Sequence, residues 1–108
     1  MLEPGLDRHE WESEWASLEE QLEESPADVL PELDDLVARM LDARGYAISD
    51  PVARGGDDRD VIADFLAARE ITRLLADGSD DVSPGDVGAA IKAYRSVYEF
   101  LLEERRMP

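Results

Sequence analysis

The sequence has 108 residues, enough for one compact domain, and 44% of them are hydrophobic, which argues against a disordered chain. It contains no cysteine, so disulfides, thiolate metal sites and cysteine nucleophiles are excluded. Its 27 acidic and 11 basic residues give a formal net charge of −16, which opposes binding to nucleic acid and to anionic membrane surfaces. We therefore expect a soluble, cytoplasmic protein that neither binds nucleic acid nor inserts into a membrane.

The negative charge is concentrated in the first part of the chain. Residues 1–44 hold 14 acidic and 3 basic residues, whereas residues 45–108 hold 13 acidic and 8 basic ones. The simpler interpretation is a surface that maintains solubility. The alternative is an acidic face that docks a basic partner or mimics nucleic acid.

A first helix is predicted over residues 8–24, with Asp7 as its cap and Glu10 three residues further on. Its apolar residues recur every three or four positions and form one narrow stripe between acidic faces. They are Trp11, Trp15, Leu18 and Leu22. Tryptophan carries a large apolar area, so the stripe must cover something. It either packs on the rest of the domain or belongs to a detachable arm that binds a second subunit or a partner.

A second helix is predicted over residues 26–44. Ser25 is a suitable cap, and Pro26 suits the first helical position because no backbone N–H is needed there. Pro31 removes a backbone donor inside the helix, so it should bend the helix or delay its regular start. Gly45 can adopt the left-handed conformation that ends the helix. Residues 46–57 then form the longest connection.

The third helix is predicted over residues 58–77, with Asp57 or Asp58 as its cap and Gly78 at its end. The fourth is predicted over residues 84–106, where Ser83 and Asp86 form a shortened capping box. No strand pattern competes with these four helices. We therefore predict a single all-α domain over residues 1–108, folded as a four-helix antiparallel up-and-down bundle with short loops.

The sequence offers no recognisable catalytic or metal-binding pattern. Paired Glu-x-x-His motifs, a G-x-S-x-G nucleophile and a phosphate loop are all missing, and His9 is the only histidine. The acidic turn over residues 77–81 does not follow the spacing of a calcium loop. We expect a non-enzymatic protein with no catalytic residue, no cofactor and no metal.

A basic cluster is expected where the third and fourth helices meet. Its members are Arg69, Arg73, Lys92 and Arg95. One interpretation is ion pairing within the bundle, with candidate partners Asp64, Glu70 and Glu99. The other is a small-anion site between the two helices, lined by the hydroxyl groups of Tyr94 and Tyr98.

Several short motifs along the chain match the order and spacing of a sequence pattern seen in other proteins. They are Arg44-Gly45-Tyr46 with Asp50, Val61-Ile62, Phe65, Ala67-Ala68, Ile71, Gly78, Asp86-Val87, Ala90, Tyr94-Arg95, Tyr98 and Leu101-Leu102. Over roughly residues 9–103 the sequence resembles an uncharacterised family of small bacterial helical domains. The resemblance implies a recurring helical domain and supplies no activity.

The sequence departs from that family in two respects. Family members often carry the domain after an N-terminal membrane segment and a charged linker, and neither is present here, so membrane association is not expected. The family pattern often has His-Pro where this sequence has Asp58-Arg59, and Tyr-Arg where it has Phe65-Leu66.

The sequence is most consistent with a non-enzymatic acidic domain that binds another protein. The candidate partner-binding residues are those of the tryptophan stripe, Trp11, Trp15, Leu18 and Leu22. Two alternatives remain open. One is a homo-oligomeric structural module, and the other is a small-anion-binding protein that uses the basic cluster.

Overall fold

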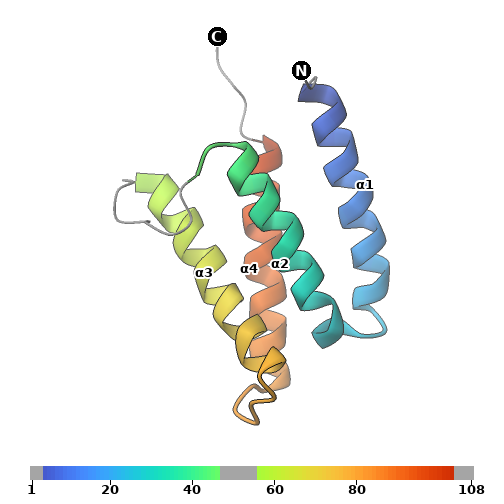
Figure 1. Cartoon of the computed structure of the whole chain (residues 1–108), viewed down its shortest axis with the longest axis vertical. Helices are drawn as coiled ribbons and strands as arrows, with labels where there is room; N and C mark the ends of the chain where they lie inside the picture. Colours follow the sequence, from blue (N-terminus) through green and yellow to red (C-terminus); the bar gives the residue numbers. More distant parts are fainter. Residues whose placement is uncertain (1–3, 47–55, 104–108) are drawn as a thin grey trace.

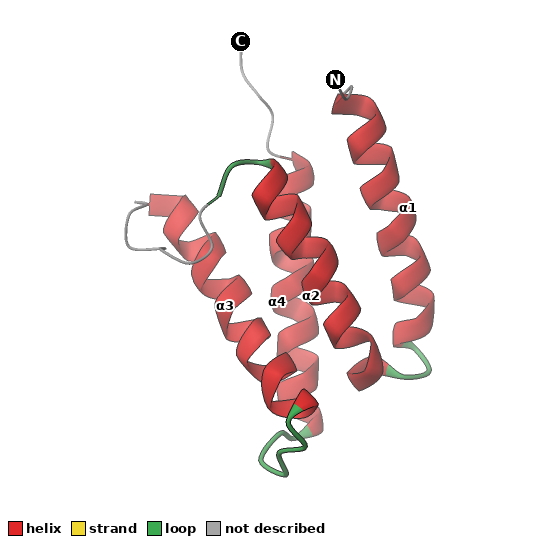
Figure 2. Ribbon diagram, viewed as in Figure 1, coloured by secondary structure: helices red, strands yellow, loops and turns green. Residues whose placement is uncertain are grey.

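The computed structural model describes residues 4–46 and 56–103. These residues form four α-helices and contain no strand (Figures 1 and 2). The helices are α1 (Pro4–Leu22), α2 (Pro26–Ala43), α3 (Gly56–Ala76) and α4 (Pro84–Glu103). The prediction of an all-α protein with four helices is confirmed.

Two helices begin earlier than expected. α1 begins at Pro4 and α3 at Gly56, so Asp7, Asp57 and Asp58 lie within first turns instead of at capping positions. Pro4 is compatible with this position, because a proline in the first turn of a helix sacrifices no backbone hydrogen bond. Most of the predicted connection, residues 47–55, lies outside the described residues.

The start of α4 follows the predicted capping box. The backbone N–H of Asp86 donates to Ser83 Oγ at 3.1 Å, and the N–H of Ser83 donates to Asp86 Oδ2 at 3.0 Å. α2 differs, because Ser25 makes no side-chain capping bond. α2 is also helical from Pro26 through Pro31, so Pro31 does not delay its start.

Glycines end α2 and α3 as predicted. Gly45 has a φ of 85° and Gly78 a φ of 80°, a conformation that glycine adopts without steric cost. In each case the next residue donates its N–H five residues back, from Tyr46 to the Leu41 carbonyl and from Ser79 to the Leu74 carbonyl. These bonds satisfy carbonyls that would otherwise have no partner at the helix end.

α2 is the central element of the domain, because it packs against each of the other three helices. α3 packs closely on α4, and α1 packs mainly on α2 (Figure 1). The Cα atoms span 47 × 32 × 19 Å. α1 therefore covers one side of a compact group formed by the other three helices.

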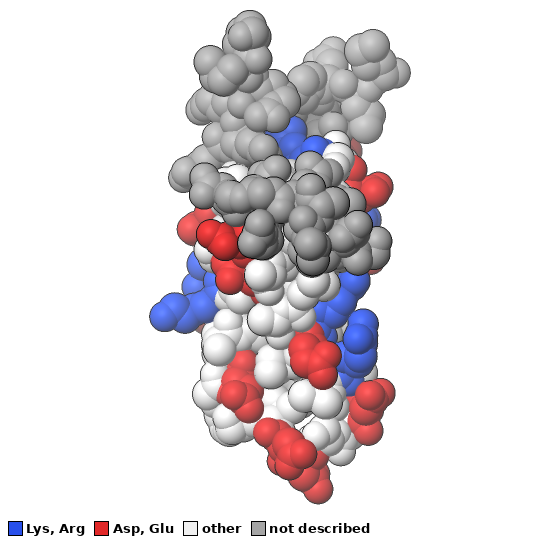
Figure 3. All heavy atoms as spheres, turned by 90° about the vertical axis from the view of Figure 1, so that its left-hand side faces the viewer, with Lys and Arg blue, Asp and Glu red and all other residues white. Residues whose placement is uncertain are grey.

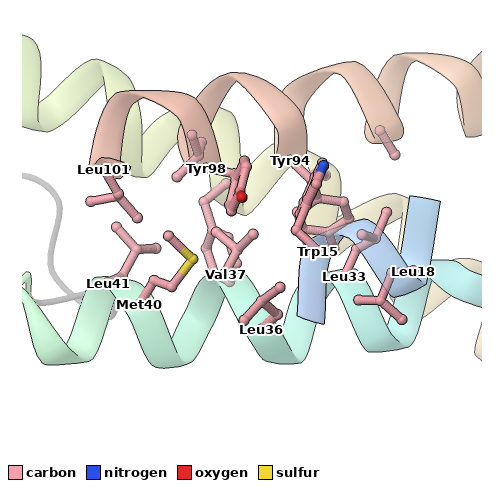
Figure 4. Close-up of a cluster of buried hydrophobic side chains, with 14 of the residues drawn as sticks. Trp15, Leu18, Leu33, Leu36, Val37, Met40, Leu41, Tyr94, Tyr98 and Leu101 are labelled. Atoms are coloured by element: carbon pink, nitrogen blue, oxygen red, sulfur yellow. The ribbon is translucent and has the colours of Figure 1, made fainter. Parts of the chain in front are cut away.

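The core takes side chains from all four helices (Figure 4). α2 contributes the largest continuous set: Val29, Leu30, Leu33, Leu36, Val37, Met40 and Leu41. Tyr94 and Leu101 of α4 and Phe65 of α3 are fully buried against them. α1 adds Trp11, Trp15 and Leu18, so the tryptophan stripe packs within its own chain.

Two arginines form hydrogen bonds that link the C-terminal end of α4 to the neighbouring helices. Arg8 of α1 donates from Nη1 to the Leu102 carbonyl at 2.7 Å, and Arg44 after α2 donates from Nη2 to the Leu101 carbonyl at 3.4 Å. Carbonyl groups at a helix C-terminus lack intrahelical partners and carry partial negative charge. Both guanidinium groups therefore stabilise α4 and hold this end of the domain together.

Candidate functional site

The tryptophan stripe is almost entirely covered. Trp11, Trp15 and Leu18 are only 8%, 5% and 5% exposed, and Leu22 alone is half-buried. Trp15 stacks on Tyr98 of α4 with ring centroids 4.1 Å apart and planes 8° from parallel (Figure 4). A partner could reach the first three side chains only after α1 had left the domain, so Leu22 is the one that remains on the surface.

The predicted basic cluster is divided among different partners. Arg69 pairs with Asp34 of α2, whereas Arg95 pairs with Glu19 of α1 at 2.6 Å. Arg73 and Lys92 are exposed and make no ion pair with any described residue. The geometry therefore gives no support to an anion site that would use all four side chains together.

The expected partners of this cluster were wrong. Asp64, Glu70 and Glu99 are exposed, and none of them pairs with a described arginine or lysine. Each of these carboxylates lies close to an arginine or lysine along the chain. The observed partners, Asp34 and Glu19, lie far from Arg69 and Arg95 in sequence and are brought close by the packing of α2 and α1.

A partly buried polar network that was not predicted from the sequence joins α2, α3 and α4. Asp34 accepts three hydrogen bonds from Arg69, of which the shortest is 2.9 Å from Nη2, and a fourth from the Tyr94 hydroxyl at 2.8 Å. The Tyr94 hydroxyl also lies 2.7 Å from Thr72 Oγ1. The guanidinium of Arg69 stacks over the ring of Phe65 at 4.7 Å. The network satisfies every polar group that it brings into the core, which favours a structural role.

Burial shifts the titration of two tyrosines on α4. Burial, together with the nearby Glu12 and Glu19 carboxylates, raises the pKa of Tyr98 to about 12. Burial also raises the pKa of Tyr94 well above its usual range. In both cases the fold favours the neutral phenol, so folding becomes less favourable once the unfolded tyrosine can ionise.

We therefore expect the protein to lose stability in alkali. The contribution of the two tyrosines is fully present below pH ~10, where unfolded tyrosine is neutral, and it falls as pH rises through about 12. Each tyrosine that ionises only on unfolding adds a slope of about 1.4 kcal/mol per pH unit. Urea denaturation at several alkaline pH values measures this slope, and Tyr98→Phe should make it shallower. An unchanged slope in that variant would contradict the role assigned to Tyr98.

Arginines neutralise only part of the acidic surface of α1 and α2. Arg39 bridges Glu14 and Asp35, and Arg8 pairs with Glu12. Other carboxylates of these two helices have no such partner among the described residues. Four carboxylates around the α1–α2 turn make no hydrogen bond or ion pair with the described residues: Glu20, Glu24, Asp28 and Glu32.

The same four carboxylates line one groove between α1 and α2. The groove has a volume of about 430 Å³ and is completed by Gln21, Ser25 and Val29. No group of three or more histidines, aspartates or glutamates within the described ranges is arranged to hold a metal ion. The carboxylates are therefore spread along a surface, an arrangement that suits several separate cationic side chains.

A second groove lies between α1 and α4. Its volume is also about 430 Å³, and its lining combines apolar and charged side chains. The lining residues are Ala16, Glu19, Glu20, Leu22, Glu23, Ile91 and Arg95. Because Glu20 lines both grooves, the last turns of α1 separate two depressions that have one carboxylate in common.

The α3 side of the domain has a different character. A smaller groove of about 220 Å³ between α3 and α4 is lined by Ala67, Ala68, Ile71, Ala89, Ala90 and Ala93. Figure 3 shows this side, where many uncharged residues lie in the centre, basic side chains lie at the left and right edges, and acidic side chains are scattered over the face and gather at its lower end. Of these three grooves, only the two beside α1 are lined by acidic side chains.

Comparisons with known proteins identify no relative. No family model, no curated protein and no solved structure matches this chain. The resemblance to a bacterial helical family therefore stays a prediction. No helix in the described part of the chain combines the length and hydropathy that a membrane span requires.

Proposed function

We propose that this protein is a non-enzymatic interaction domain that binds a basic partner protein. In this proposal an antiparallel up-and-down four-helix bundle is the scaffold, and the groove between α1 and α2 is the binding surface. The observation that carries the proposal is that Glu20, Glu24, Asp28 and Glu32 line one groove without any compensating cation among the described residues.

The position of the acidic residues on α1 supports this proposal. The last turn of α1 contains no basic residue, and Glu20 lies there, near the negative end of the helix dipole. A carboxylate in that position costs about 0.3–1 kcal/mol of helix stability. Sequences that break a local stability rule without a structural gain often do so at functional surfaces. A basic partner would supply the missing positive charge.

Two variants with equal net charge test the proposal. The groove variant carries Glu20→Gln, Glu24→Gln, Asp28→Asn and Glu32→Gln. The control variant removes four exposed charges from α3 and the following turn: Asp60→Asn, Asp64→Asn, Glu70→Gln and Asp80→Asn. Each variant changes the net charge from −16 to −12, so the general attraction for cations weakens equally in both.

The probe is a fluorescent peptide made of lysine and alanine, and its binding is followed by anisotropy at low salt. We expect the groove variant to bind about tenfold more weakly than the wild type, because exposed charge pairs contribute about 0.2–1 kcal/mol each. The control variant should lose less than about twofold. Equal losses in both variants would show that only the net charge matters, and the proposal would fail.

A further inference from the structure

The groove between α1 and α4 has a feature that the α1–α2 groove lacks. Leu22 of α1 and Ile91 of α4 are half-buried hydrophobic side chains packed against the core, and both line this groove. The exposed Ala16 extends this apolar lining along α1. An added apolar side chain would therefore find hydrocarbon contacts here that continue outward from the core.

The charges around this apolar lining are unevenly compensated. Arg95 neutralises Glu19, with both side chains about two-fifths exposed. Glu20 and Glu23 also line the groove, and neither makes an ion pair with a described residue. An apolar floor with a negative rim is complementary to an apolar side chain flanked by lysine or arginine.

The charge of the chain decides among the candidate occupants. A second copy would bring another −16 charge to a rim that is already negative, and an anionic membrane surface would be repelled for the same reason. A basic amphipathic segment satisfies both the rim and the floor. Such a segment commonly binds as a helix whose apolar face lies in a groove.

We propose that the α1–α4 groove holds an apolar side chain of the same basic partner whose cationic side chains occupy the α1–α2 groove. This inference rests on the proposed function and adds the chemistry of the partner, a basic amphipathic segment. Glu20 lines both grooves, so one segment that crosses the last turns of α1 contacts both. Leu22 then retains the partner-binding role predicted for it, and Ile91 joins it from α4.

Two peptides of about 14 residues, or four helical turns, test the inference. The first has leucines every three or four positions among lysines, and the second has alanine in place of each leucine. The wild-type protein should bind the leucine peptide about fivefold more tightly, since partial burial of one leucine accounts for a difference of that size. Ile91→Ala should reduce the preference for the leucine peptide to less than about twofold. Leu22→Ala, on α1, should reduce it to the same extent.

Ile71→Ala is the matched control. Ile71 is also a half-buried isoleucine, but it lines the groove between α3 and α4. This variant should keep the full preference for the leucine peptide, and circular dichroism should show that all three variants are folded. If either Ile91→Ala or Leu22→Ala does not fold, the other of these two variants still decides the outcome.

The outcomes separate this inference from the function on which it rests. Equal binding of both peptides by the wild type, with weaker binding by the four-carboxylate groove variant, would overturn the α1–α4 inference and leave the proposed function standing. If Ile71→Ala removes the preference for the leucine peptide and Ile91→Ala does not, the leucine binds outside the α1–α4 groove. That result would also overturn the inference. Absence of binding by the wild type at low salt would overturn both proposals.

Discussion

Replacing Asp34 by alanine is expected to lower the free energy of unfolding by about 3 kcal/mol, because it removes a partly buried ion pair together with the hydrogen bond from Tyr94 and leaves the Arg69 charge uncompensated. Asp34 has a side chain that is only 14% exposed, and it accepts hydrogen bonds from both Arg69 and Tyr94. Without it, the guanidinium of Arg69, which is 33% exposed, has no carboxylate partner. Tyr94 keeps only its contact with Thr72.

Asp35→Ala provides the control for this prediction. Asp35 is the next residue, its side chain is 70% exposed, and it pairs with Arg39 at 2.9 Å. Its removal should cost less than about 0.5 kcal/mol, because exposed ion pairs contribute little. Urea denaturation followed by circular dichroism measures both values. Similar losses in the two variants would show that the Asp34 network is no stronger than a surface ion pair.

Arg69 allows the interaction itself to be isolated. A double-mutant cycle that combines Asp34→Ala with Arg69→Ala should give a coupling energy of about 1–3 kcal/mol, as expected for residues in one hydrogen-bonded network. The double variant should then be more stable than the sum of the single losses suggests. Strictly additive losses would show that Asp34 stabilises the domain mainly through Tyr94.

The helices and most of their ends could be predicted because their signals are local. The capping box at Ser83 and Asp86 involves residues three apart, and the glycines that end α2 and α3 act within one turn. The same local reasoning placed the starts of α1 and α3 too late. At α1 the predicted cap was Asp7, whereas the helix already includes Pro4, a residue that suits a first turn.

The central position of α2 and the Asp34 network could not be predicted, because both depend on contacts between distant residues. Asp34 and Tyr94 are 60 positions apart, and nothing near either residue indicates the other. One signal was nevertheless available. Asp34 lies four residues after Leu30 and three before Val37, so it is a carboxylate on the apolar stripe of α2. A charged residue in such a position usually has a buried partner.

The α1–α4 and α1–α2 grooves could not be predicted from the sequence for a related reason. Leu22 was predicted correctly as an apolar position on α1, but its exposure depends on where α4 ends up, and Ile91 borders it only in the folded chain. The acidic groove joins the end of α1 to the start of α2 across the turn at Ser25. Composition indicated that this region is acidic, and only the packing showed which carboxylates lack cations.

Trp15→Ala is expected to cost about 3–4 kcal/mol of unfolding free energy, the range for truncating a large aromatic residue in a core. Trp15 is 5% exposed and lies flat against Tyr98. The polar side-chain links from α1 to α4 among the described residues are the Arg95–Glu19 ion pair, which is about two-fifths exposed, and the hydrogen bond from Arg8 to the Leu102 carbonyl. We therefore expect α1 to separate from the domain before the other helices unfold.

Hydrogen exchange tests this order of unfolding, since amides in a helix that opens first lose protection first. In Trp15→Ala the amides of α1 should lose more protection than those of α2 and α4. Trp15→Phe is the control, because it retains an aromatic ring against Tyr98 and should cost less than about 2 kcal/mol. Uniform loss of protection over all four helices would show that α1 is an inseparable part of one cooperative unit.

In either case a tryptophan variant would alter the fold together with any binding, so substitutions at Leu22, Ile91 and the groove carboxylates are the informative ones for partner recognition.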